Sequence, residues 1–411
     1  MMNRLPAAGL ALLALAAAAR AQEWPGWRGP LGDGTSKEAS FPLKWSATEG
    51  VRWKVPLAGK GHSSPVVWGD RIFLTTCVED KEERRLVCLD RKDGRTLWDQ
   101  LVVAVPKEKK HNLNSFSSST PVTDGKHVWV AFMEGKSFSV FCYDVEGKLA
   151  WKKSPGTFWS PHGFCSSPLL YKDLVIFNGD QDADAWIVAL DQASGEEKWR
   201  ADRPNKTRSY APPVIFEAAG KKQLVLSGSK CVASYDPETG KQHWIIDGPT
   251  EQFVASMVQA EGVFFITGGF PQYHVLGIRP DGSGNVTDTH ILWRDKGPNV
   301  CSYVPSPIAW GPHFFIASDT GFVSCFEAKT GKRLWNEKMS KHVSASPVAA
   351  GGHLYFTDDA GATHVLKAGP TLEVVAKNEL GEECYASPAL SRGRIYLRSM
   401  KHLYCIGEGA E

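Results

Sequence analysis

Residues 87–98 read Val-Cys-Leu-Asp-Arg-Lys-Asp-Gly-Arg-Thr-Leu-Trp, and residues 187–199 follow the same order as Ile-Val-Ala-Leu-Asp-Gln-Ala-Ser-Gly-Glu-Glu-Lys-Trp. Each stretch is a run of β-forming residues, a turn with glycine, and a second run that reaches tryptophan. Glycine suits the turn because a tight hairpin needs a residue at positive φ. The pattern predicts two antiparallel strands, and five copies carry the turn glycine: Gly94, Gly147, Gly195, Gly240 and Gly331.

A small residue followed by proline stands upstream of each hairpin and starts another β-forming run. Eight such positions occur, with methionine in place of the fifth proline: Ser64-Pro65, Thr120-Pro121, Ser167-Pro168, Pro212-Pro213, Ser256-Met257, Ser306-Pro307, Ser346-Pro347 and Ser387-Pro388. They lie 56, 47, 45, 44, 50, 40 and 41 residues apart, which suits one four-stranded blade per copy. The chain is therefore predicted to be an all-β, eight-bladed β-propeller of four-stranded antiparallel blades.

The tryptophan strand predicts how the ring closes. Six copies carry it: Trp98, Trp151, Trp199, Trp244, Trp293 and Trp335. The seventh copy has Val375 and Ala376 at this place, and the eighth ends before it, whereas residues 51–55 form a tryptophan strand without a blade of its own. We expect this N-terminal strand to complete the last blade, because a closed ring has no free sheet edge that would invite aggregation.

The first residues have the layout of a secretory signal peptide, with a short basic start, an apolar run and a small-residue cleavage site before Gln22. Glutamine stands where lipid anchoring would need cysteine. The sequence thus predicts a signal peptide at 1–21, a lead-in segment at 22–50 and the propeller at 51–411, in a periplasmic or secreted protein. We expect the lead-in to pack on the ring, because its three tryptophans would be a solubility liability if exposed.

Charge argues against nucleic acid and membrane partners. The chain has 47 Lys and Arg against 45 Asp and Glu, and removal of residues 1–21 takes away Arg4 and Arg20 and leaves 45 of each sign. A nearly neutral protein has no electrostatic attraction to nucleic acid or to an anionic membrane surface. The apolar run of the signal is too short to span a bilayer, so membrane insertion is not expected.

Nine cysteines in an exported chain raise the question of disulfides. Four of them occupy one repeat position: Cys88, Cys142, Cys325 and Cys405. Other copies place Ala189, Ser234 and Gly277 there. A position that accepts Cys, Ala, Ser and Gly requires a small side chain, so these four cysteines are predicted to be buried packing residues. The other five are scattered, and they allow one bridge but no disulfide framework.

The hairpins at 87–98 and 187–199 resemble the pyrroloquinoline-quinone (PQQ)-like repeat, in which Ala-Leu-Asp, two further residues and Thr-Gly precede tryptophan. The resemblance covers residues 51–406 and points to an exported bacterial PQQ-like propeller of the quinoprotein alcohol dehydrogenase-like superfamily. It implies one of two classes. Some members are dehydrogenases that hold PQQ and Ca²⁺ on the axis. Others are binding scaffolds, such as the propeller lipoprotein of the bacterial outer-membrane β-barrel assembly machinery.

Several features of the chain favour the scaffold class. It has neither the adjacent cysteine pair on which quinoprotein alcohol dehydrogenases stack their cofactor nor a Cys-x-x-Cys-His haem attachment. It also lacks the lipidation cysteine of the assembly lipoprotein. We expect a non-catalytic scaffold that binds a protein or a small-molecule ligand at its axial mouth and needs no cofactor. The alternative is a reduced dehydrogenase that uses PQQ and Ca²⁺ to oxidise alcohols or sugars.

The mouth is the end of the propeller axis at which loops enter the innermost strands. Counted back from each proline, every second residue shares a strand face. The ring next to the proline is uniformly small, and the rings further out are polar and individual. No catalytic residue is assigned, and ten residues are predicted to bind the ligand: Lys60, His62, His162, Arg208, Tyr210, Gln252, Tyr303, His342, Glu383 and Tyr385.

Three charged stretches carry weaker signals. The carboxylates of residues 180–184 alternate as calcium ligands do, but the glycine and the distal glutamate of a calcium loop are missing. We therefore expect a solvated acidic turn without a metal. Residues 79–85 are expected to be a charged hairpin tip, and residues 107–111 a solvated basic loop.

Overall fold

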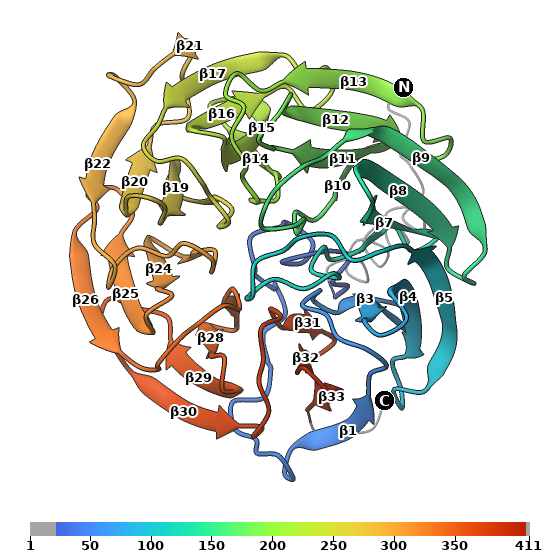
Figure 1. Ribbon diagram of the computed structural model, residues 1–411. Coiled ribbons are helices and arrows are strands. Elements are labelled where there is room, and N and C mark those ends of the chain that lie inside the picture. The colour runs from blue at the N-terminus through green and yellow to red at the C-terminus, as the bar shows by residue number, and fades with distance from the viewer. Residues whose placement is uncertain (1–21, 408–411) are drawn as a thin grey trace, which may run out of the picture.

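The computed structural model describes residues 22–407, and every regular element within them is a β-strand. Eight sheets stand around a common axis in the order of the sequence, as the blades of a propeller (Figure 1). The predicted eight-bladed architecture is confirmed. The predicted signal peptide at 1–21 lies outside the described residues. In the part that is described, no helix is long and apolar enough to cross a membrane.

Each blade is a four-stranded antiparallel sheet, and its strands are given in order from the innermost, next to the axis, to the outermost. Blades 1 to 4 consist of β2 (Val66–Trp68), β3 (Arg71–Val78), β4 (Glu83–Asp90) and β5 (Thr96–Ala104); β6 (Val122–Thr123), β7 (His127–Glu134), β8 (Ser137–Asp144) and β9 (Leu149–Thr157); β10 (Leu169–Tyr171), β11 (Leu174–Gly179), β12 (Trp186–Asp191) and β13 (Glu197–Asp202); and β14 (Val214–Ala218), β15 (Lys221–Gly228), β16 (Cys231–Tyr235) and β17 (Gln242–Asp247).

Blades 5 to 8 follow the same plan. They consist of β18 (Val258–Ala260), β19 (Val263–Gly268), β20 (His274–Ile278) and β22 (Ile291–Asp295); β23 (Ile308–Trp310), β24 (His313–Ala317), β25 (Phe322–Glu327) and β26 (Arg333–Lys338); β27 (Val348–Ala350), β28 (His353–Thr357), β29 (Ala362–Lys367) and β30 (Val374–Glu379); and β31 (Ala389–Ser391), β32 (Arg394–Arg398), β33 (His402–Ile406) and β1 (Val51–Pro56). A two-residue strand, β21 (Gly284–Asn285), pairs in parallel with the outer edge of β17.

The N-terminal strand closes the ring as predicted. β1 pairs antiparallel with β33, from Val51 opposite Ile406 to Pro56 opposite His402. Arg398, at the end of β32, reinforces the seam, because its buried guanidinium donates to the carbonyls of Ser63 and Thr75 in blade 1 at 3.0 and 2.8 Å. The two ends of the propeller chain are therefore joined both by a sheet and by a charged side chain.

The strand tryptophans join adjacent blades. In six blades the indole Nε1 donates a hydrogen bond to a backbone carbonyl of the next blade: Trp53 to Arg91, Trp98 to Val145, Trp151 to Gln192, Trp199 to Pro237, Trp293 to Ala328 and Trp335 to Gly369. The turn glycines lie beneath these rings. A Cβ at Gly331 would stand 2.2 Å from Trp293, and the φ of Gly331 is +69°. Glycine is thus required for the turn and also for the approach of the preceding blade.

The small repeat position faces the same tryptophans across the sheet. Four buried cysteines occupy it: Cys88 opposite Trp98, Cys142 opposite Trp151, Cys325 opposite Trp335 and Cys405 opposite Trp53. Blade 7 reverses the sizes, with Val365 opposite Ala376. The size of the residue is therefore set by its cross-strand neighbour, which explains the predicted packing role. All nine cysteines are free thiols, and all but Cys165 are buried.

The lead-in segment supplies the tryptophan that blade 7 lacks. Trp45 is buried in one core cluster with residues of blades 7 and 8, and its ring stacks on Tyr355 at a centroid distance of 6.5 Å. Its backbone N–H donates to Asn378 Oδ1 at 2.9 Å, and Asn378 Nδ2 donates to the carbonyl of Leu43 at 3.0 Å. The expected packing of the lead-in is thus observed, and it completes a seam between blades.

The lead-in also closes one end of the axis. Trp24 forms an antiparallel bridge with Val67 of β2 in blade 1, and Thr35 forms a parallel bridge with Ala349 of β27 in blade 7. Between them, Arg28 donates from Nη2 to the carbonyl of Pro307 at 2.7 Å. These partners lie at or beyond the small-proline positions, whereas the mouth residues precede them. The segment therefore blocks the end of the axis opposite the mouth, where its blue trace crosses the centre of the ring in Figure 1.

Candidate functional site

A ring of hydroxyl groups forms the floor of the mouth. At five places the backbone N–H of a residue before the proline donates to a hydroxyl of another blade: Ser64 to Thr120, Thr120 to Ser167, Ser256 to Ser306, Ser306 to Ser346 and Ser346 to Ser387, at 2.8 to 3.0 Å. The sequence indicated that this ring must be small. The structure adds that it must also accept hydrogen bonds, a requirement visible in the use of Ser and Thr rather than Ala or Gly.

Three predicted residues meet on the side of the mouth that blades 3 and 4 form. The hydroxyl of Tyr210 lies 3.0 Å from His162 Nδ1 and 2.8 Å from Ser160 Oγ. Burial raises the pKa of Tyr210, so this hydroxyl stays protonated. Burial, followed by the charge of Arg208, lowers the pKa of His162, which favours the neutral imidazole. Arg208 donates from Nη1 to Asp182 Oδ2 at 2.8 Å.

Gln252 and Tyr303 form a second pair on blades 5 and 6. The Tyr303 hydroxyl donates to Gln252 Oε1 at 3.1 Å, while the buried Nε2 of Gln252 has no hydrogen-bond partner among residues 22–407. Burial raises the pKa of Tyr303. Arg208 interacts electrostatically with both Tyr303 and Tyr210, which shows that the two groups are neighbours across the mouth.

The remaining predicted residues lie on blades 1, 7 and 8. The rings of His62 and Tyr385 are 4.8 Å apart between centroids. Burial, with the charges of Arg398 and Lys110, lowers the pKa of His62 to about 3. Lys60 pairs through its backbone with Cys77, and its side chain is exposed on the rim.

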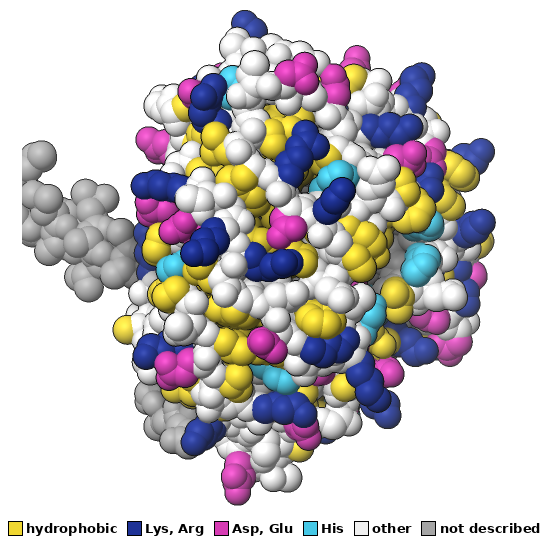
Figure 2. Space-filling model, turned by 90° about the vertical axis from the view of Figure 1, so that its left-hand side faces the viewer, with side chains coloured by type: hydrophobic (Ala, Val, Ile, Leu, Met, Phe, Trp, Pro, Cys, Tyr) yellow, Lys and Arg dark blue, Asp and Glu magenta, His cyan; other side chains and the backbone are white. Residues whose placement is uncertain are grey.

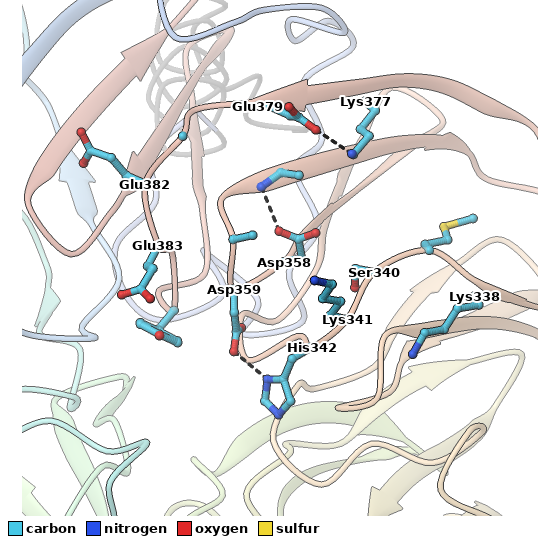
Figure 3. Close-up of a pocket in the computed structure, with 15 residues that line it drawn as sticks. Lys338, Ser340, Lys341, His342, Asp358, Asp359, Lys377, Glu379, Glu382 and Glu383 are labelled. Carbon is cyan, nitrogen blue, oxygen red and sulfur yellow. Dashed lines mark hydrogen bonds and ion pairs between the residues drawn. The ribbon is translucent and has the colours of Figure 1, made fainter.

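His342, Glu383 and Tyr385 line a cavity of about 850 Å³ on top of blade 7 (Figure 3). His342 Nδ1 lies 2.6 Å from Asp359 Oδ2, which also accepts a hydrogen bond from the hydroxyl of Ser344.

Glu382 is held as a carboxylate at the edge of this cavity. Partial burial opposes ionisation, but hydrogen bonds with Lys54, Ser399 and His402 hold the pKa of Glu382 at about 2. Lys54 lies 2.7 Å away in β1 and His402 2.9 Å away in β33. The carboxylate therefore joins the closing strand to blade 8 and is not free to bind a ligand.

Two aspartates that the sequence reading missed orient the mouth loops. Asp319 accepts hydrogen bonds from the backbone N–H groups of Tyr303 and Val304, at 2.6 and 3.0 Å. Asp359 accepts one from the N–H of Ser344 at 2.7 Å. Both aspartates begin an Asp-x-Gly turn, at 319–321 and 359–361. This recurrence is the signal by which the sequence could have revealed them.

The acidic turn at 180–184 is solvated only in part: Asp184 is exposed as expected, whereas the carboxylate at the start of the turn is not. Asp180 is fully buried, and Arg203 Nε donates to it at 2.9 Å. Asp182 pairs with Arg208, and Asp184 with Lys206 at 2.5 Å. Each carboxylate of the turn is bound by a cation of residues 203–208, so the alternation reflects a ladder of ion pairs. Across residues 22–407 no three His, Cys, Asp or Glu side chains gather as a metal site would require.

The charged hairpin tip at 79–85 needs a similar correction. Arg84 is buried, donates to the carbonyl of Val105 at 2.5 Å, forms an ion pair with Glu108, and packs over the ring of Phe116. It anchors the loop between β5 and β6 from below. The expected basic loop at 107–111 does carry exposed lysines, but its one carboxylate points inward to Arg84.

Eight blades in a closed ring, joined by the repeated tryptophan and glycine, define the chain as a PQQ-like repeat β-propeller. More narrowly, the chain belongs to the family described as outer membrane protein assembly factor BamB, whose profile matches residues 43–136, 82–269, 285–369 and 319–406.

Known proteins of two functional classes are similar to this chain. The outer membrane protein assembly factor BamB of Burkholderia pseudomallei is 22% identical over 364 residues, which cover 84% of this chain and 82% of the relative. The structure of BamB from Moraxella catarrhalis superposes with a TM-score of 0.61 at 13% identity, over 87% of this chain and 98% of the other. A europium-containing methanol dehydrogenase superposes with a TM-score of 0.66 at 13% identity, over 94% and 92%. At such identities the superpositions show the shared fold alone.

Proposed function

We propose that this protein is an exported, non-catalytic scaffold that binds a partner through the loops at its axial mouth. The observation that carries the proposal is the difference between the two ends of the axis. The lead-in segment closes one end with backbone bridges at Val67 and Ala349. The other end presents individual polar and aromatic side chains on loops that neighbouring residues hold in place. A surface of exposed, oriented side chains is what recognition requires.

A protein is the partner class that the relatives support. Two of them are named as factors in the assembly of outer membrane proteins. Positive and negative side chains are interspersed over the side of the ring in Figure 2, which offers no uniformly basic surface for nucleic acid. The signal peptide predicted at 1–21 would deliver such a scaffold to the periplasm or to the outside of the cell.

A PQQ-dependent dehydrogenase is the alternative that the shared fold raises. The unpartnered donors Arg208 Nε and Gln252 Nε2 could meet an acidic ligand. The residues present do not fit the accompanying Ca²⁺, however, which takes six to eight oxygen ligands. Asp182, Asp319 and Asp359 are already bound by Arg208, by backbone N–H groups and by His342. Among the ten predicted residues only Glu383 is a carboxylate.

Two experiments separate these functions. In the first, purified protein is titrated with PQQ in the presence of Ca²⁺ and supplied with alcohols or sugars and an artificial electron acceptor. We expect no saturable absorbance change and no oxidation, and oxidation would overturn the scaffold proposal. In the second, a photo-crosslinking amino acid replaces Tyr385 at the mouth or Leu31 at the closed end in living cells. We expect a crosslinked partner only at Tyr385, and crosslinks confined to Leu31, or absent at both, would contradict the mouth as binding surface.

A further inference from the structure

A ridge of two adjacent loops stands out on the mouth, formed by residues 107–114 between β5 and β6 and residues 158–163 between β9 and β10. Figure 1 shows the loop between β5 and β6 reaching inward over the ring. Two hydrogen bonds join the loops, because His111 N and Asn114 Nδ2 donate to the carbonyl of His162 at 3.1 and 2.8 Å. The rings of His111 and His162 also meet edge to face at 5.5 Å. The ridge is thus one structural unit.

Two large apolar side chains of the ridge are exposed to solvent. Trp159 is 53% exposed and Leu113 is 50% exposed. The backbone of Trp159 is nevertheless fixed, because its N–H donates to Gln181 Oε1 at 2.9 Å and its carbonyl accepts from the N–H of Asp182 at 3.4 Å. Phe158, the preceding residue, is buried in the core of blades 2 and 3. An exposed indole on a fixed backbone is a typical anchor of a protein interface, since the backbone loses little conformational entropy on binding.

The ridge carries positive charge that nothing in the described chain neutralises. Lys107, Lys109 and Lys110 form no ion pair within residues 22–407, and Glu108 between them points inward to the buried Arg84. The neighbouring basic segment is the opposite case. There Arg203, Lys206 and Arg208 each pair with an aspartate of the turn at 180–184. Lys110 packs over the ring of Phe116, at 5.1 Å from its centroid, and keeps its charge. In a chain with nearly balanced charge, the three lysines without ion pairs are a local excess beside an apolar anchor.

We infer that the ridge binds an acidic segment of a partner protein, with an aromatic or leucine side chain of that segment packed against Trp159 and Leu113. This inference deepens the proposed scaffold function by naming the part of the mouth and the chemistry of the partner. Lysines beside an apolar anchor complement carboxylates that flank an apolar residue. Such complementarity selects the partner and accelerates its association.

The test uses a short fluorescein-labelled peptide in which a Leu-Phe pair is flanked on both sides by Asp and Glu. Binding to the full-length mature protein is measured by fluorescence anisotropy. We expect saturable binding that weakens as salt is added, because Lys107 and Lys109 are exposed and Lys110 is half-buried. The same peptide with lysine in place of each acid should not bind. The triple charge reversal Lys107→Glu, Lys109→Glu and Lys110→Glu and the single change Trp159→Ser should each weaken binding about tenfold or more.

The closed end of the axis offers matched control variants. Leu31 is 49% exposed there, as Leu113 is on the ridge, and Lys37 is exposed without an ion pair. Leu31→Ser and Lys37→Glu should therefore leave peptide affinity unchanged, and thermal unfolding of each variant confirms that it folds. The inference is overturned if the acidic peptide does not bind, if the lysine peptide or an oligothymidylate binds as well, or if the ridge variants bind like the parent protein.

Crosslinking distinguishes failure of this inference from failure of the scaffold proposal. A photo-crosslinking amino acid at Trp159 should capture the same partner as one at Tyr385, and the captured peptide should be rich in Asp and Glu. Capture at Tyr385 but not at Trp159, or capture of a peptide without acidic residues, overturns the ridge as docking site and leaves the mouth as binding surface. Capture at neither position contradicts both.

Discussion

The two ends of the propeller axis are built in different ways. At the closed end, a continuous segment of the chain pairs through its backbone with Val67 and Ala349 and buries Trp24 and Arg28. At the mouth, side chains meet in small groups, such as Tyr210 with His162 and Gln252 with Tyr303. Residues that are buried or paired through the backbone tolerate few substitutions without loss of stability, whereas exposed loop side chains can vary without loss of the fold. The difference shows that backbone pairing and large buried side chains lie at one end of the axis, and individual loop side chains at the other.

Arg28 illustrates how tightly the closed end is packed. Its guanidinium is buried among the lead-in and the start of β23, and burial lowers the pKa of Arg28 to about 10. Its Nε and Nη1 have no hydrogen-bond partner in the described chain. A Cβ at Gly34 would stand 2.7 Å from its Nη2, and one at Gly29 2.8 Å from the ring of Trp24. Glycine therefore allows the lead-in to fold over these side chains.

The largest difference in unfolding free energy between the two ends is expected when a tryptophan is replaced by alanine at each end. Trp24→Ala removes a fully buried indole and should lower the free energy of unfolding by about 3–5 kcal/mol. Trp159→Ala removes an indole that is 53% exposed at the mouth and should change it by less than about 0.5 kcal/mol. Urea unfolding followed by intrinsic fluorescence measures both. Equal effects would show that the two ends do not differ in their contribution to stability.

One ion pair near the mouth, between Asp180 and Arg203, should contribute as much to stability as the buried residues of the closed end do. Asp180→Asn leaves the fully buried Arg203 without its counter-charge and should cost about 3 kcal/mol of unfolding free energy. Asp184→Asn is the matched control, because Asp184 pairs with Lys206 on the surface. Its urea midpoint should equal that of the parent protein. A stable Asp180→Asn variant would show that the pair is dispensable.

Acid should lower the free energy of unfolding through the protonation of His62, a mouth residue. Its folded pKa of about 3 lies below the ordinary value of 6.5, so between these values the unfolded state binds a proton that the folded state does not. Stability is full above pH 6.5 and falls as the pH decreases toward 3. From pH 7 to 5 the loss due to His62 should be about 1–2 kcal/mol. His62→Gln should show a correspondingly flatter pH profile in urea unfolding, and parallel profiles would contradict this account.

The ring of hydroxyls between the two ends should give the smallest effect. Ser306→Ala removes the acceptor for the backbone N–H of Ser256, at 2.8 Å, and leaves that buried donor unpaired. The expected cost is about 1 kcal/mol of unfolding free energy. Ser306→Thr retains the hydroxyl and should recover part of the loss in the same assay. If alanine and threonine behave alike, the ring requires small size but no acceptor.

The fold could be predicted well from the sequence because the same few residues recur in the same order in each repeat. Every copy begins with a small residue, followed in all but one by proline, and most copies add a turn glycine and a tryptophan. The period and spacing of these residues then define the ring. The candidate site was predicted less completely. The ten residues do lie on the mouth loops, but their grouping into pairs depends on which loops face each other. Asp319 and Asp359, which orient those loops, are distant from them in sequence.

The charged stretches show where sequence reasoning reached its limit. Asp180 and Arg203 are 23 residues apart and buried together, and Arg84 lies beneath Glu108. A carboxylate in a turn is exposed unless another segment brings it a cation, and nothing local reveals that segment. Local composition therefore predicted solvated loops, and it missed the buried charged residues Arg84, Asp180 and Arg203 within or beside them.

By itself, the sequence determined the number of blades, the closing strand, the small cysteine position and the loops that form the mouth. These features follow from local periodicity and from strand chemistry, which repeat along the chain and can be read there. Only the tertiary structure decided that the lead-in blocks one end of the axis, that Trp45 replaces the missing tryptophan of blade 7, and that the ridge lysines have no ion pair within residues 22–407. Each of these depends on contacts between segments far apart in sequence, and a repeat period carries no information about them.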